Sequence, residues 1–174
     1  MATGSLILLD NQTITNGSSV SLGLSNWSTS YNHYIVNWAN TTFSVDGVSF
    51  RMRVFTSGTE ATGAFYNQAA IVETSVSEYN NALQSYSEFY INYNGYGSAS
   101  GEVASGELYL GNFNESGRYP MWYGSWTGIR DTGETQTQLG GGAHYVAQTN
   151  NGVKFYTASG TFSGEFSLYG LEYS

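Results

Sequence analysis

The side chains of this sequence that could act in catalysis are few and scattered. His33 and His144 are the two histidines, and neither stands in the His-Glu-x-x-His spacing of a zinc site. The thirteen Asp and Glu residues would allow a glycosidase pair, which needs two carboxylates about 5 to 9 Å apart. No stretch singles out a pair, and the closest acidic cluster, Asp131 with Glu134, lies in a Gly/Thr-rich loop. We therefore predict a protein without enzymatic activity, metal site or cofactor.

The aromatic segment 121–126 is a candidate binding surface. If this segment is a strand, Trp122 and Trp126 share one face and Tyr123 lies on the other. Flat aromatic side chains bind sugar rings and also anchor protein interfaces. Core packing is our first interpretation for at least one tryptophan, with a protein interface second and glycan contact third. Trp122, Tyr123 and Trp126 are thus candidate binding residues.

The apolar run Leu6-Ile7-Leu8-Leu9 is a second candidate for contact with a partner. It is too short for a membrane span, and the residues before it lack the basic start of a signal peptide. These features predict synthesis in a cytoplasm and no membrane partner. Residues 1–15 are interpreted as an N-terminal arm or edge strand, and the four apolar side chains would add onto a neighbour's sheet.

The composition indicates strands joined by turns. Of the 174 residues only 10% are charged, while Gly (22) and Tyr (15) are abundant and proline occurs once. No segment has the Ala, Leu, Glu and Lys mixture of a long helix. The net charge of −8 repels phosphate backbones, so nucleic acid is not expected as a partner. There is no cysteine, hence no disulfide or thiolate metal site.

Alternation and turn residues predict the strands. Asn-Gly at 16–17 and Asp-Gly at 46–47 predict hairpins in 5–24 and 43–54, and 153–171 reads as a hairpin or corner. Residues 69–72 form a short strand, 77–84 a helical turn or loop, and 136–143 a loop. About eight to ten short strands predict an all-β antiparallel sandwich, jelly-roll-like, in one domain over 1–174. A barrel or an immunoglobulin-like sandwich is the alternative.

One C-terminal phrase resembles a known group of proteins. The run is Lys154-Phe-Tyr-Thr-Ala-Ser-Gly-Thr-Phe-Ser-Gly-Glu-Phe-Ser-Leu-Tyr-Gly170. It is similar to the C-terminal signature of small virion proteins from bacteriophages, frequent in phages of cyanobacteria and other marine bacteria. Residues 8–14 and 105–110 also fit that group, whereas Glu165 and Ser167 depart from its usual pattern.

The resemblance implies a structural or adhesion role on a virion. A capsid decoration or cement subunit is the favoured role, and a tail-fibre or tail-spike tip that binds host-surface glycan or receptor is the alternative. A third alternative, a secreted lectin-like module, lacks a signal peptide to support it. The expected partners are the major capsid protein and further copies of this chain, because few charged residues protect its strand edges. A trimer is the expected oligomer, on the resemblance.

Overall fold

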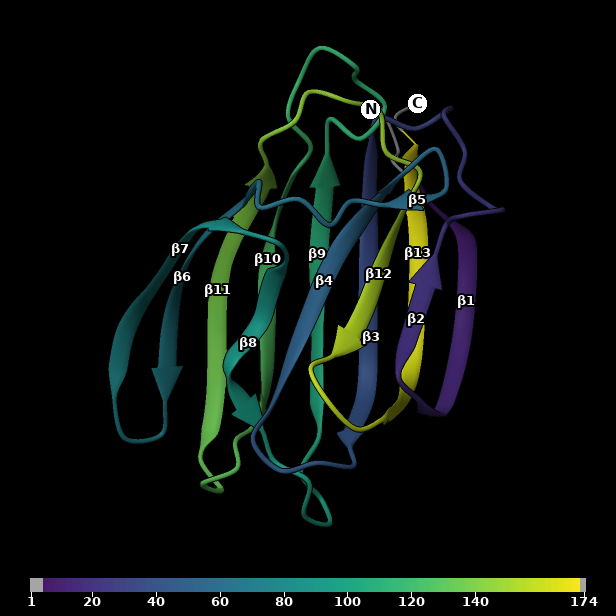
Figure 1. The fold of residues 1–174 in the computed structure, drawn as a ribbon. Coiled ribbons are helices and arrows are strands. Elements are labelled where there is room, and N and C mark those ends of the chain that lie inside the picture. The colour runs from purple at the N-terminus through teal and green to yellow at the C-terminus, as the bar shows by residue number, and fades with distance from the viewer. Residues whose placement is uncertain (1–4, 173–174) are drawn as a thin grey trace.

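Two antiparallel β-sheets pack face to face in the computed structural model, which describes residues 5–172 (Figure 1). The order of the eight-stranded sheet is β1 (Ser5–Gly17), β13 (Phe162–Glu172), β3 (His33–Phe43), β9 (Ala104–Gly111), β10 (Met121–Ile129), β11 (Thr135–His144), β6 (Tyr66–Thr74) and β7 (Glu78–Tyr86). The five-stranded sheet contains β2 (Ser19–Leu22), β12 (Gly152–Thr157), β4 (Val48–Thr56), β5 (Thr59–Glu60) and β8 (Phe89–Tyr96). Residues 5–172 contain no helix, and thus none that could cross a membrane.

Eight of the strands form a jelly roll. The order β1-β13-β3-β9 in one sheet faces β2-β12-β4-β8 in the other. Among these eight strands the chain changes sheet at every step except from β4 to β8, as the two Greek keys of a jelly roll require. Four further strands, β10, β11, β6 and β7, widen the first sheet, and β5 joins the second (Figure 1). The predicted all-β, jelly-roll-like sandwich is confirmed, with more strands than the eight to ten expected.

The two predicted local hairpins are wrong, because each turn connects one sheet to the other. β1 pairs with β13 while β2 pairs with β12, and β3 pairs with β13 and β9 while β4 pairs with β12 and β8. One residue of each pair has a positive φ, 52° at Asn16 and 67° at Gly47, whereas the two-residue hairpin turn needs a positive φ at both. Turn chemistry sets local φ, whereas packing across the molecule selects the partner of each strand. The C-terminal stretch is likewise a corner, between β12 and β13.

Two segments predicted as loop or helical turn are strands. The predicted turn at 77–84 lies in β7, an edge strand with few apolar residues and thus a weak pattern. The predicted loop at 136–143 lies in β11, whose three glycines run beside β6. A Cβ on Gly140 would lie 2.5 Å from the carbonyl oxygen of Ala69, and one on Gly142 would lie 2.4 Å from that of Asn67. Glycine is therefore required for these two strands to approach so closely.

Aromatic side chains fill the space between the sheets. Phe50 of β4 is fully buried at the centre, with five aromatic neighbours: Trp38, Phe43, Phe155, Phe162 and Phe166. Burial of large aromatic rings is the main source of stability in a core with few large aliphatic residues.

Candidate functional site

Trp122 and Trp126 point into the core and not to the surface. Each is 2% exposed, and the ring of Phe89 lies edge-on at 5.4 Å from Trp122 and 5.9 Å from Trp126. A surface binding role for these two tryptophans is therefore wrong, and the core interpretation is confirmed. Tyr123 lies on the opposite face of β10 and is 64% exposed, as the alternation predicted.

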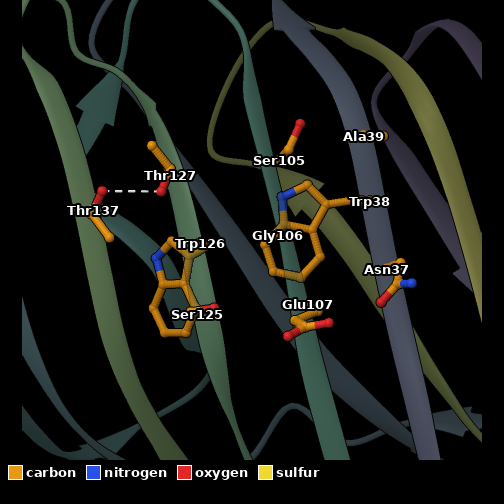
Figure 2. Close-up of a pocket in the computed structure, with 10 residues that line it drawn as sticks. All are labelled: Asn37, Trp38, Ala39, Ser105, Gly106, Glu107, Ser125, Trp126, Thr127 and Thr137. Carbon is orange, nitrogen blue, oxygen red and sulfur yellow. Dashed lines mark hydrogen bonds between the residues drawn. The ribbon is translucent and has the colours of Figure 1, made fainter.

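A shallow hollow of about 520 Å³ lies over the middle of the eight-stranded sheet (Figure 2). Trp38 and Trp126 flank Gly106, where a Cβ would lie 2.4 Å from atoms of both. Thr127 and Thr137 share a hydrogen bond of 3.0 Å at its margin (Figure 2). Glu107 is the single carboxylate among the ten lining residues, so the hollow lacks the pair of carboxylates that glycoside hydrolysis uses.

The strand register arranges the outward side chains of the eight-stranded sheet in rows that cross it. The first row is Leu6, Leu171, His33, Gly111, Met121, Ala143 and Asn67. The second row is Leu8, Tyr169, Ile35, Tyr109, Tyr123, Gly141, Ala69 and Ala82. We call these two rows the apolar band. His33 and Asn67 are its polar members, and it contains no Asp, Glu, Lys or Arg.

The apolar band is large for a surface patch. The band crosses eight strands about 4.8 Å apart, and each of its two rows is about 7 Å wide, so its area is on the order of 450 Å². The largest apolar patch of a typical monomer is about 300–600 Å² and is often functional. Leu6, Leu8 and Met121 are each about half exposed in it, and Tyr123 more so. The band is therefore the principal candidate for a binding surface in the described chain.

The sequence-derived candidates divide between the two faces. Leu6, Leu8 and Tyr123 all lie in the apolar band, although β1 and β10 are far apart in sequence. Ile7 and Leu9 alternate to the other face of β1, where Leu9 packs against the core. The predicted arm is in fact an edge strand of its own sheet, paired with β13, and its residues 1–4 lie outside the described residues.

The two halves of the apolar band differ in side-chain size. On β1, β13 and β3 the band carries leucine, tyrosine, isoleucine and histidine side chains, whereas on β11, β6 and β7 it carries mainly glycine and alanine. The small residues leave a trough of about 400 Å³ whose lining includes Gly141, Ala143, Ala69 and Ala82. Because Ala69 and Ala82 were unremarkable in the sequence, the trough was not predicted.

A second hollow, of about 270 Å³, lies in the middle of the band at Gly111. A Cβ on Gly111 would meet no atom within 4 Å, so the missing side chain creates the space. His33, Met121, Tyr109 and Tyr123 are among the residues around it, and the two tyrosine rings stack at 5.1 Å. The hollow is thus apolar and aromatic, with a few polar groups at its margin, as small binding pockets are.

The outer face of the five-stranded sheet differs from the band, because it carries a cluster of ion pairs. Arg53 contacts Glu60 at 2.7 Å and Glu88 at 3.0 Å, Arg51 contacts Glu88 at 3.2 Å, and Lys154 contacts Glu60 at 2.7 Å. Burial disfavours both carboxylates, but hydrogen bonds from their partners outweigh it and lower the pKa of Glu60 and of Glu88. The cluster ties β4 to β5, β8 and β12 and is structural.

The histidines and the acidic loop have ordinary roles. His144 is buried against the ring of Tyr66 at 4.7 Å, and burial lowers its pKa. Glu134 of the predicted acidic cluster pairs with Arg130 at 2.9 Å. Among residues 5–172, no group of three or more His, Asp or Glu side chains is placed to hold a metal ion.

No family model, no curated protein and no solved structure matches this chain.

Proposed function

We propose that this protein is a bacteriophage virion structural protein without enzymatic activity, made in the host cytoplasm and acting as a capsid decoration or cement subunit. The observation that carries the proposal is the apolar band, which crosses all eight strands without a charged side chain. The largest apolar patch of a protein is often a functional surface, and depletion of charged residues is characteristic of the core of a protein interface.

The C-terminal phrase that resembles phage virion proteins contributes to the same surface. It spans β12, the corner and most of β13, and β13 supplies Tyr169 and Leu171 to the band. Tyr169 is the residue that the phrase and the band share, since Leu171 directly follows the phrase and the large apolar side chains Phe155, Phe162, Phe166 and Leu168 of the phrase are buried in the core. On this proposal the band contacts the major capsid protein or further copies of this chain, and a homotrimer is the oligomer that the resemblance implies.

The placement is tested on purified particles. A decoration subunit co-purifies with DNA-filled heads stripped of their tails, in copy numbers that match the capsid lattice. Tyr123→Lys in the band should release it from heads, whereas Tyr93→Lys, at an exposed tyrosine of β8 in the other sheet, should not. Loss of the chain together with the tails would contradict a head location.

A tail-fibre or tail-spike tip that binds host glycan is a second proposal, favoured by the hollow at Gly111. Its lining combines Tyr109 and Tyr123 with His33 and Asn112 and contains no carboxylate, lysine or arginine. Such a pocket suits one uncharged sugar ring, which offers apolar C–H groups and hydroxyls. Binding to host-surface polysaccharide that Gly111→Leu abolishes would favour this role, since that side chain fills the hollow.

A further inference from the structure

We infer that two copies of this chain bind face to face through the apolar band, about a two-fold axis that runs along the strands between β9 and β10. The inference rests on the proposed function's use of the band and deepens it by naming a second copy as the partner of that surface. The contact is two-fold and thus departs from the homotrimer that the resemblance implies. An isologous contact of this kind requires a self-complementary surface, in which each residue meets a different residue of the other copy.

The axis divides the sheet into two sets of four strands. It places β1 opposite β7 of the second copy, β13 opposite β6, β3 opposite β11, and β9 opposite β10. The half of the band with large side chains thereby covers the half with glycine and alanine. The trough of about 400 Å³ in each copy receives side chains of the other.

Complementarity extends to individual positions in the second row. Leu8 faces Ala82 of the second copy, because both stand on the outermost strands of the sheet. Tyr169 in the same way faces Ala69, and Ile35 faces Gly141. These three pairs each join a large side chain to a small one, as close packing across an interface demands. Beside the axis, Tyr109 faces Tyr123 of the second copy, which joins two large aromatic side chains.

The first row repeats the pattern at the centre of the contact. Gly111 and Met121 are direct neighbours on β9 and β10. The axis therefore places Gly111 of one copy opposite Met121 of the second copy, and Met121 opposite Gly111. The half-exposed Met121 side chain of one copy then enters the 270 Å³ hollow at Gly111 of the other. Methionine is flexible enough to fill such an irregular space.

The available area matches what a stable dimer needs. The band alone, on the order of 450 Å², is smaller than the roughly 800 Å² per partner of a standard interface, so the contact must include the polar rows beside it. With them, eight strands about 4.8 Å apart and about nine residues long form a face on the order of 1,000 Å². The band itself brings no charges together, but in the next row Glu107 faces Ser125 of the second copy beside the axis, so the two Glu107 side chains come close to each other. Beyond it, Glu165 comes opposite Glu73 of the second copy, so moderate salt should strengthen the contact by screening this repulsion.

The experiment is analytical ultracentrifugation of the purified chain and four variants. Wild type should have twice the 18.9 kDa chain mass at tens of micromolar. Leu8→Lys and Ala82→Glu should each weaken the dimer at least about tenfold, since each puts an unpaired charge in an apolar contact. The double variant Leu8→Lys/Ala82→Glu should recover most of this loss, because each new lysine faces a new glutamate of the other copy.

The fourth variant, Val76→Lys, is the control. Val76 is 72% exposed in the turn between β6 and β7 and lies outside the band, so its replacement should leave the mass unchanged. Circular dichroism confirms that every variant is folded. A wild type that stays monomeric at hundreds of micromolar, a trimeric mass, or a double variant no better than its parents would overturn the two-fold contact.

The outcome is separable from that of the proposed function. A monomer whose attachment to heads is abolished by Leu8→Lys would overturn the dimer but leave the virion role intact. A dimer of the expected behaviour that is absent from particles would overturn the virion role alone.

Discussion

Replacement of Phe166 by alanine is the most direct test of the core. Phe166 lies on β13, the strand between β1 and β3, and its side chain is fully buried. Its ring centre is 5.6 Å from that of Phe162, 5.7 Å from Phe155 and 6.3 Å from Phe50. The substitution therefore removes one ring from a cluster to which both sheets contribute.

The expected loss of stability is large. Truncation of a buried phenylalanine to alanine costs about 3–5 kcal/mol, which combines lost burial with the cavity left behind. This range is the total cost, and the three aromatic pairs that Phe166 makes place it in the upper half, at about 4–5 kcal/mol. For a chain of this length, such a loss lowers the melting temperature by about 10–20 °C.

Urea denaturation followed by tryptophan fluorescence measures this loss, because the three core tryptophans report on the packing between the sheets. Val76→Ala is the control, since Val76 is 72% exposed in the turn between β6 and β7, and its effect should stay within about 0.5 kcal/mol. A loss below about 1 kcal/mol for Phe166→Ala, the typical effect of any point mutation, would refute the placement of this ring in the core.

Three further predictions follow from particular contacts. Native hydrogen bonds lower the pKa of Glu88, so the ionised Glu88 stabilises the fold above about pH 4.5 and this stabilisation is lost as the pH falls further. Glu88→Gln should therefore lower the free energy of unfolding by about 1–3 kcal/mol at neutral pH and flatten the acid side of the pH–stability curve. Gly95→Ala should destabilise the protein more than Gly58→Ala in urea melts. Both glycines have a positive φ, but a Cβ on Gly95 would lie 2.4 Å from the Gly47 carbonyl, whereas a Cβ on Gly58 would meet no atom within 4 Å. The net charge of −8 predicts no binding to duplex DNA, and salt-sensitive binding in a filter assay would disprove this.

The features that the sequence predicted correctly depend on local alternation. Val48, Phe50, Met52 and Val54 all face the core, because a strand places every second residue on one side. The same rule separated Tyr123 from the two core tryptophans on β10. Phe155 on β12 and Phe166 and Leu168 on β13 follow the same alternation and are fully buried.

The features that were missed depend on contacts between distant segments. Asn16 and Gly47 adopt turn conformations, yet nothing local states that the next strand joins the opposite sheet. In the same way, the apolar band gathers one or two residues from each of eight strands. Leu6 and Tyr123 stood out in the sequence as apolar and aromatic residues. Ala82 could be recognised as part of the band only from the strand register, which places it on β7 at the far edge of the sheet.

The position of β13 constrains how the chain acquires its structure during synthesis. β13 is the last strand of the described chain to leave the ribosome, yet it lies between β1, the first, and β3. Until it emerges, β1 has no partner in the eight-stranded sheet and β3 has one unpaired edge. Such non-local pairing folds slowly and leaves apolar edges open to other nascent chains. Premature termination before residue 162 should therefore yield an aggregating product, and a chaperone that shields β1 would raise the yield of folded protein.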